Sequence, residues 1–258
     1  MFVYRIHSEA TREEVRSLID SGVSDFEIAK RTGVGRSTVL RWRHHGVPSP
    51  RVPMTPEIVD RAEWGPKERQ IYAYLLGQYL GDGYIGTHGS THSLVIACDI
   101  QYCRILTQVV EAVGTFAPKP PSVLRPKGTN GVRVTSYWRS WPQLFPQHGP
   151  GSKLDRKIEL VDWQVEIVDE HPKAFLRGLI HSDGSRCMNT FKMALKDGPK
   201  EYSYPRYFFT NYSADIQAIF CRTCDRLGIR WSRSNWRNIS ISHRTSVALL
   251  DEFVGPKD

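Results

Sequence analysis

Apolar residues recur three or four positions apart in two stretches of the chain, and each stretch ends in an Asp-Gly pair. The first, LLGQYLGDG, runs from Leu75 to Gly83, and the second, LRGLIHSDG, runs from Leu176 to Gly184. Spacing of three and four is that of one helix face. We therefore predict two helices that end in Asp82 and Asp183, 101 positions apart, each stopped by its glycine in the left-handed conformation.

Small residues form a stripe on each of these helices, because positions four apart share a face. The stripes are Gly77 with Gly81 and Gly178 with Ser182. Small side chains let helix backbones approach closely, so we expect the two helices to pack and to bring Asp82 and Asp183 side by side. The last-turn carbonyls add negative potential there. A hard divalent cation such as Mg²⁺, which prefers oxygen ligands, would relieve the repulsion.

The same order of elements follows each stretch. After the first we predict a strand at 93–98, a helix at 100–113, and a hairpin with arms at 122–125 and 132–137 that turns at Asn130-Gly131. After the second we predict a strand at 207–211, a helix at 214–227, paired strands at 229–233 and 238–243, and a helix at 245–254. The order helix, strands, helix, strands, helix therefore occurs twice, which predicts an α+β fold.

Polar residues alternate with apolar ones along two of these strands. Arg133 and Thr135 oppose Val132 and Val134, while Ser240, Ser242 and Arg244 oppose Ile239, Ile241 and His243. The polar faces are candidate DNA contacts. Any half-exposed antiparallel sheet shows the same alternation, so the pattern supports the fold more than it supports DNA binding.

Three short helices precede these elements. Thr11 and Ser24 are the predicted N-caps of the first two, and the third runs from Arg36 to His45 after a glycine-containing turn. The segment IAKRTGVGRSTVLRWR resembles the core of a helix-turn-helix domain. We expect Val34, Val39, Leu40 and Trp42 to face inward. That leaves Arg36, Ser37, Thr38, Arg41 and Arg43 for DNA bases and phosphates; a solvated basic helix is the alternative.

Both Asp-Gly stretches resemble the LAGLIDADG motif of homing endonucleases. They match it at the first Leu, the first Gly, the small residue before Asp and the closing Asp-Gly, and they depart from it at the sixth position, which is Leu80 or His181. The resemblance implies tandem LAGLIDADG half-domains, each αββαββα, related by a pseudo-two-fold axis, with antiparallel saddle sheets that cover DNA. It also implies metal ions bound by Asp82 and Asp183 and by the carbonyls of Gly81 and Ser182.

In the resembled enzymes a basic residue assists the carboxylates. Lys153, Lys192 and Lys196 are candidates that the sequence does not rank. We divide the chain into a helix-turn-helix domain at 1–46, a proline-rich linker at 47–66, a first half at 67–151, and a second half with its connecting loop at 152–258. Glycines and a proline predict that the connection 147–158 is exposed, with Lys153, Arg156 and Lys157 as phosphate contacts or as solvated charges.

Charge and composition are consistent with a DNA partner. The 35 Lys and Arg exceed the 27 Asp and Glu, for a net charge of +8. The sequence contains neither a membrane-spanning run nor a signal-like leader, so we expect a cytoplasmic protein, monomeric through its internal symmetry. Five cysteines fit a reducing compartment. Cys221 and Cys224 lie in a predicted helix, where a buried apolar face is favoured over a zinc site.

Two functions follow from these predictions. The first is a site-specific, Mg²⁺-dependent endonuclease that hydrolyses one phosphodiester on each strand of double-stranded DNA. The second is a DNA-binding transcriptional regulator that uses the same fold without cutting. Retention of both acids favours cleavage. An intein is disfavoured, because the ends Met1-Phe2 and Pro256-Lys257-Asp258 lack the residues that splicing requires.

Overall fold

A computed structural model describes residues 7–49, 56–195, 198–255 and 257 of the chain. It divides into two compact units, Met1–Met54 and Thr55–Asp258. Each unit has its own hydrophobic core. Within the described ranges, no helix is long and apolar enough to cross a membrane.

The N-terminal unit consists of three helices, α1 (Glu9–Asp20), α2 (Asp25–Thr32) and α3 (Arg36–His45). Ser24 caps α2 as predicted, by accepting a hydrogen bond from the Glu27 amide at 3.3 Å. The N-cap of α1 is Ser8 rather than Thr11, so that prediction was wrong by one helical turn. The three helices are as expected, and the assignment of a DNA-binding helix-turn-helix stays a prediction.

The core of this unit is built from Val15, Ile28, Val34, Val39 and Trp42. Leu40 was predicted to face inward, but its side chain is 47 % exposed. Successive residues on a helix point about 100° apart, and the small core of this unit covers the side of α3 that carries Val39 but not the side that carries Leu40. Leu40 therefore shares the outward face of α3 with Arg36, four positions before it.

The C-terminal unit contains two halves with the same order of elements. The first half is α4 (Pro66–Asp82), β1 (Gly83–His88), β2 (Thr91–Asp99), α5 (Cys103–Phe116), β3 (Ser122–Leu124), β4 (Gly131–Tyr137) and α6 (Trp141–Leu144). The second half is α8 (Pro172–Asp183), β5 (Gly184–Leu195), β6 (Gly198–Thr210), α9 (Ala214–Arg226), β7 (Ser232–Arg233), β8 (Asn238–Ile241) and α10 (Arg244–Phe253). A further helix, α7 (Asp162–Glu170), lies between the halves, and a short 3₁₀ turn (Arg61–Glu63) precedes α4. The predicted αββαββα order, present twice, is confirmed.

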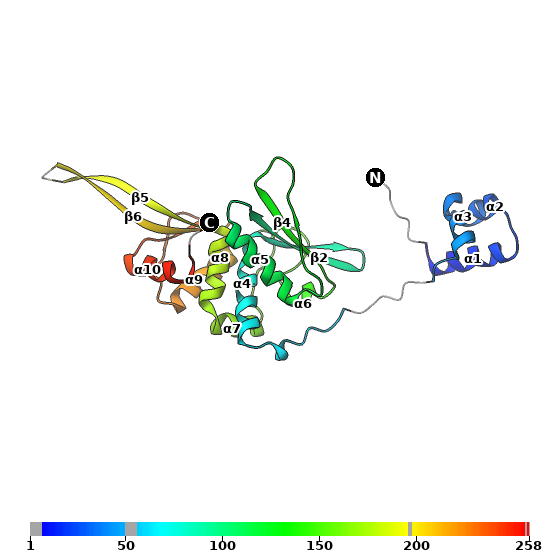
Figure 1. The fold of residues 1–258 in the computed structure, drawn as a ribbon, viewed down its shortest axis with the longest axis horizontal. Coiled ribbons are helices and arrows are strands. Elements are labelled where there is room, and N and C mark those ends of the chain that lie inside the picture. The colour runs from blue at the N-terminus through cyan, green and yellow to red at the C-terminus, as the bar shows by residue number, and fades with distance from the viewer. Residues whose placement is uncertain (1–6, 50–55, 196–197, 256, 258) are drawn as a thin grey trace. The chain divides into compact units, whose positions relative to one another are not determined.

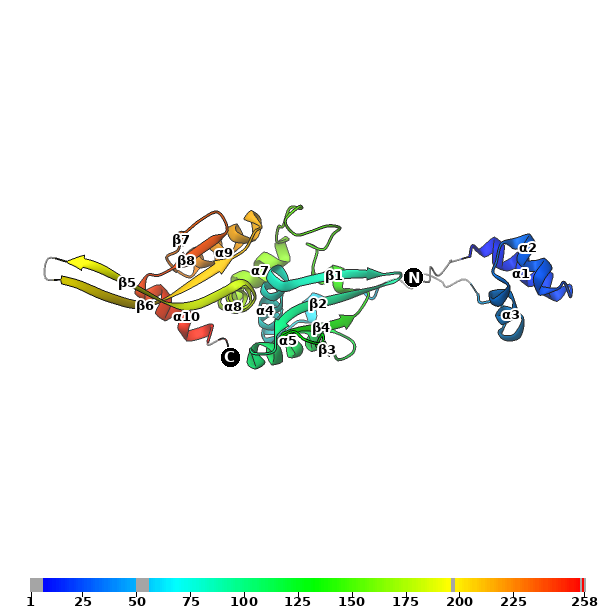
Figure 2. The same cartoon turned by 90° about the horizontal axis from the view of Figure 1, so that it is seen from above.

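Each half has a four-stranded antiparallel sheet. The strand orders are β1-β2-β4-β3 and β5-β6-β8-β7, so the two sheets have the same topology. Helices α4 and α8 lie side by side between the halves in both views (Figures 1 and 2). Every residue of α4 from Tyr72 to Leu80 is buried. One continuous core thus joins the two halves around α4 and α8.

Several local predictions differ from the structure. Strands β1 and β5 were not predicted, and β5 pairs with β6 along its full length to form a two-stranded arm that projects beyond α10 (Figures 1 and 2). The β3–β4 turn has its left-handed residue at Gly128, with φ of 78°, rather than at Asn130-Gly131. The connection 147–158 is not simply exposed, because Gln147 and Ile158 at its ends are buried.

Candidate active site

The backbones of α4 and α8 touch where their glycines meet. A Cβ atom on Gly178 would lie 2.2 Å from the Tyr74 carbonyl oxygen, and one on Gly77 would lie 2.5 Å from the Phe175 carbonyl oxygen. Both distances are too short for any real Cβ atom, so only glycine fits at these two positions. The predicted packing through small residues is confirmed.

Asp82 and Asp183 are the last residues of these two helices. A Cβ atom on Gly81 would lie 3.1 Å from the carboxyl carbon of Asp183, which places that acid beside the end of α4. Gly83 and Gly184 follow the acids, and their φ angles of −96° and −99° are extended. The predicted left-handed stop is therefore wrong at both positions.

The need for glycine after each acid comes from crowding. A Cβ atom on Gly83 would lie 2.6 Å from the Tyr79 Cα atom, and one on Gly184 would lie 2.7 Å from the Ile180 carbonyl oxygen. In each half the chain turns directly from the helix into a strand that passes close to the helix's last turn. The acids are consequently held at fixed corners between helix and sheet.

The surroundings of both carboxyl groups favour protonation. Desolvation and, to a smaller extent, the neighbouring Asp82 charge together raise the pKa of Asp183 to about 6, against the opposing effect of a hydrogen bond from Asn211. The pKa of Asp82 is also raised by desolvation, although its side chain keeps contact with solvent. Asn211 Nδ2 donates to Asp183 Oδ2 at 2.5 Å. The two acids thus carry mutual repulsion that a cation would relieve.

Lys153 lies at this site. Its Nζ donates to the carbonyl oxygens of Tyr79, Leu80 and Gly81 at 2.7, 2.7 and 2.8 Å, at the negative end of α4. Burial lowers the Lys153 pKa to about 8, while Asp183 and Asp82 raise it. Among the three candidate lysines, Lys192 lies on the arm, 3.8 Å from Glu201, and Lys196 falls outside the described residues.

A second lysine at the acids was missed in the sequence. Lys257 Nζ donates to the Gly184 carbonyl oxygen. Burial lowers the pKa of Lys257, and both Asp82 and Asp183 raise it. A signal for it existed, because Lys153 lies 71 positions after Asp82 and Lys257 lies 74 positions after Asp183. The internal repeat thus supplies one ammonium group after each half.

The neighbours of the two acids differ. Strand register pairs Gly83 with Ile96 and Gly184 with Phe209, so Cys98 and Asn211 occupy equivalent positions, each two residues further on. Asn211 donates to Asp183. Burial and the Asp82 charge raise the pKa of Cys98 to about 12, which keeps its thiol protonated. Asp183 therefore has an amide partner, whereas Asp82 has a neutral thiol nearby.

The oxygen donors fit a divalent cation. Two carboxylates meet beside backbone carbonyls, and hard cations prefer such ligands. Across residues 7–49, 56–195, 198–255 and 257, no three His, Cys, Asp or Glu side chains form a group that could hold a metal ion. Of the predicted ligands, the Gly81 carbonyl accepts from Lys153, while Ser182 uses its hydroxyl to donate to Gly178 and Leu179 carbonyl oxygens at 3.1 and 3.0 Å.

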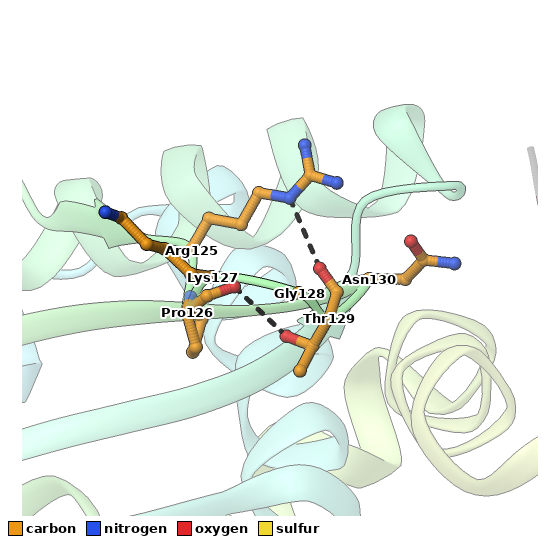
Figure 3. Close-up of a pocket in the computed structure, with 6 residues that line it drawn as sticks. All are labelled: Arg125, Pro126, Lys127, Gly128, Thr129 and Asn130. Carbon is orange, nitrogen blue, oxygen red and sulfur yellow. Dashed lines mark hydrogen bonds between the residues drawn. The ribbon is translucent and has the colours of Figure 1, made fainter.

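A pocket of about 240 Å³ adjoins Asp82. Asp82, Cys98, His181 and Lys257 are among the residues that line it. Another cavity, of about 350 Å³, is formed entirely by the β3–β4 loop, residues 125–130 (Figure 3). In that loop Arg125 Nε donates to the Thr129 carbonyl oxygen and Thr129 Oγ1 donates to the Pro126 carbonyl oxygen, both at 3.3 Å. The two cavities share no lining residue.

The predicted DNA contacts on the sheets have different surroundings. Arg133 is exposed on β4, but Thr135 on the same strand and Ser240 on β8 are buried. Ser242 is exposed just after β8 ends at Ile241. Arg244 is the first residue of α10, so its predicted position on a strand was wrong. The last strand is shorter than its alternating pattern suggested.

On α3 the predicted contacts also separate into two groups. Arg36, Ser37 and Arg41 are exposed and Thr38 is partly exposed. Arg43 instead donates to Asp25 Oδ1 at 2.7 Å and to the Val23 carbonyl oxygen. Arg43 therefore ties α3 to the start of α2.

The paired cysteines lie on α9. Cys221 and Cys224 are both buried, as predicted for an apolar helix face. Burial raises the pKa of both thiols, to about 11 for Cys221. Zinc binds thiolates, so this environment disfavours it.

No protein-family model matches the sequence, and comparison with curated proteins finds no relative. Among solved structures, the N-terminal LAGLIDADG domain of WhiA is similar, with 14% identity and a TM-score of 0.48 over 76% of this chain and 85% of that one. The homing endonuclease I-DmoI in complex with DNA and Mn has 16% identity and a TM-score of 0.47, over 73% of this chain and 98% of that one. The LAGLIDADG meganuclease I-AabMI bound to uncleaved DNA has 13% identity and a TM-score of 0.46, over 70% of this chain and 82% of that one.

The order of elements in this chain, with acids at the ends of two paired central helices, matches the tandem arrangement that the resemblance to the LAGLIDADG motif implied.

Proposed function

We propose that the chain is a monomeric, divalent-metal-dependent endonuclease that cuts both strands of double-stranded DNA. The observation that carries this proposal is the pair Asp82 and Asp183, held side by side at the ends of α4 and α8. Lys153 and Lys257, one following each half in the sequence, both interact electrostatically with both acids. Paired acids with nearby ammonium groups suit phosphodiester hydrolysis, in which negative charge grows on phosphate oxygens.

The chain's residues have distinct roles in this proposal. Asp82 and Asp183 would hold the cation, with the Ser182 carbonyl as a further oxygen donor. When bound, the cation supplies a more acidic water and neutralises charge on the phosphate. Lys257 binds a phosphate oxygen, whereas Lys153, whose three N–H groups are donated to α4 carbonyl oxygens, stabilises the developing negative charge through its own charge alone. Asn211 orients the Asp183 carboxylate through its hydrogen bond.

The N-terminal unit would add a second DNA contact. Arg36, Ser37 and Arg41 are exposed on α3, where a recognition helix presents donors to base edges and phosphates. The exposed Leu40 lies on the same face and suits contact with a thymine methyl group. Replacing Arg36 and Arg41 by Ala in the full chain should weaken DNA binding and reduce its salt dependence, as measured by fluorescence anisotropy. Unchanged affinity would exclude this role.

Cleavage of a randomised plasmid library in Mg²⁺ tests the catalytic claim. The wild-type protein should produce double-strand cuts at defined sequences, and Asp82→Asn and Asp183→Asn should produce none. These substitutions keep the side-chain size and remove the charge, so the variants should fold and still bind DNA. Cuts that persist in both variants would place catalysis elsewhere.

A non-cleaving DNA-binding regulator is the second candidate, and one observation favours it. Lys153 already occupies the Gly81 carbonyl, and two ammonium groups face two carboxylates, so the charges can balance without a cation. This candidate predicts DNA binding that weakens with salt, no cuts in Mg²⁺ or Mn²⁺, and unchanged binding in both Asp→Asn variants.

A further inference from the structure

His181 occupies the sixth motif position in the second half, where the first half has Leu80. The imidazole is buried between α8 and the end of α10. Its Nδ1 lies 3.1 Å from the Tyr74 hydroxyl oxygen, and its Nε2 lies 2.8 Å from the Val254 carbonyl oxygen. One ring therefore links α4, α8 and the C-cap residue of α10.

The direction of these hydrogen bonds is fixed by chemistry. A carbonyl oxygen can only accept, so Nε2 carries the proton and donates to Val254. Nδ1 then accepts from the Tyr74 hydroxyl, which itself accepts from Gln78 Nε2 at 2.9 Å. Burial lowers the His181 pKa to about 4, which agrees with a neutral ring. The Val254 carbonyl thus fixes the tautomer, and Gln78 and Tyr74 hold the other side of the ring in place.

The end of α10 leads directly to the site. Val254 lies three residues before Lys257, whose Nζ donates to the Gly184 carbonyl oxygen. His181 and Lys257 line the same pocket of about 240 Å³ as Asp82. Lys153 needs no such anchor, because three carbonyl oxygens of α4 hold its ammonium group.

We propose that His181 is a positioning residue that anchors Val254 and so keeps Lys257 beside Asp82 and Asp183. Its effect on cleavage rests on the proposed function, whereas the anchoring itself does not. The sixth motif position, an ordinary core leucine in the first half, here fixes the segment that carries the second lysine.

Amide hydrogen exchange of the full-length protein, read by mass spectrometry, tests the anchor. His181→Leu installs the residue of the first half and keeps the core filled. It should speed exchange about tenfold in a peptide covering 244–258, while a peptide covering 147–158, which carries Lys153, stays unchanged. His181→Gln retains an N–H donor and should restore part of the protection. Leu80→Met, a conservative change at the equivalent position, should leave both peptides unchanged.

Two results would overturn the anchor. One is unchanged exchange at 244–258 in His181→Leu. The other is equal acceleration in both peptides, which would indicate a general loosening of the core. If His181→Leu does not fold, Tyr74→Phe provides the second variant, because it removes the hydroxyl that holds the ring at Nδ1 and should accelerate exchange at 244–258 alone.

Strand-resolved cleavage tests the consequence for the site. His181→Leu should slow the same strand as Lys257→Met, by about tenfold, and the double variant should be no slower than Lys257→Met alone. Additive losses would contradict action through Lys257. Absence of cleavage in the wild type would remove the endonuclease proposal, and the exchange experiment would still decide the anchor.

Discussion

The two halves of the C-terminal unit share a backbone plan but surround their acids with different groups. In the first half three carbonyl oxygens of α4 hold Lys153 of the following connection, and a thiol, Cys98, lies near Asp82. In the second half an amide donates to Asp183, and Lys257 follows a histidine-anchored helix end. The helix contact and the acids are common to both halves, whereas the groups that tune each acid are not.

The sheets differ in a similar way. Strand β5 has 12 residues and β1 has 6, so the arm of the second half is about 20 Å longer at about 3.3 Å per residue. Both sheets keep the same strand order. The comparison teaches that the packing of α4 against α8 tolerates little change, while the strands and side chains around it can diverge. The following predictions test this contrast between the constrained α4–α8 contact and the more variable groups around it.

The largest expected effect is on the shared helix contact. Gly178→Ala and Gly77→Ala should each destabilise the fold by about 3 kcal/mol or more, because each Cβ would overlap backbone atoms that cannot move independently. Gly114→Ala is the matched control: its Cβ would meet only Pro121 Cδ at 3.7 Å, so Ala in the α5 interior should be neutral or stabilising. Urea denaturation measures all three. Similar stabilities would show that the α4–α8 contact is loose.

The two lysines should have similar effects on cleavage and different effects on stability. Lys153→Met and Lys257→Met should each slow cleavage by about ten- to a hundredfold, since each removes one positive charge from the reacting phosphates. Lys153→Met should also cost about 1–2 kcal/mol of stability, because three carbonyl oxygens lose their donor. Single-turnover rates and urea denaturation separate the two effects. Equal stability losses would mean that the lysines are held equally firmly.

Exchanging the residues beside the two acids should change the cleavage rates of the two DNA strands in opposite directions. Asn211→Cys should slow cleavage of one strand by about tenfold, and Cys98→Asn should speed cleavage of the other by a smaller factor. The physical reason is that the amide orients Asp183, whereas Cys98 stays protonated. End-labelled duplexes report each strand separately. If both strands slow equally in Asn211→Cys, the two acids do not act on separate strands.

The smallest effect is a pH dependence. Cleavage should fall as pH decreases through about 6, because a protonated Asp183 cannot hold a cation. The pKa of this acid is higher in the folded state than its ordinary value, so its contribution to stability is present at low pH and is lost as pH rises through about 6. Asp183→Asn should therefore be more stable than wild type at pH 7 and lose that advantage below about pH 4. An advantage that persists below pH 4 would contradict the raised pKa.

The sequence predicted the parts of the fold that depend on local patterns. Apolar spacing located α4 and α8, and small residues four apart located their contact. Strand β1 was missed because its Gly and Thr residues resemble a loop, and its strand conformation depends on pairing with β2, the one neighbour that this edge strand has in its sheet. The role of Gly83 was misjudged because crowding by Tyr79 is a tertiary effect that no local pattern records.

The candidate site was only partly predictable for the same reason. Asp82 and Asp183 belong to a repeated motif, so the sequence identifies them directly. Lys257 lies far along the chain from both, and only its spacing within the repeat indicates it. The exposure of Leu40 and the ion pair of Arg43 with Asp25 depend on how the helices of the N-terminal unit pack.

The most direct test of the central claim uses a duplex selected for binding from a random pool by the wild-type protein. Strand-resolved, single-turnover cleavage of that duplex is then measured in Mg²⁺ for wild type, Asp82→Asn and Asp183→Asn. We expect the wild type to cut both strands and each variant to lose about two to three orders of magnitude in rate while still binding. Tight, salt-dependent binding by the wild type without cuts on either strand would contradict the endonuclease and leave a DNA-binding regulator.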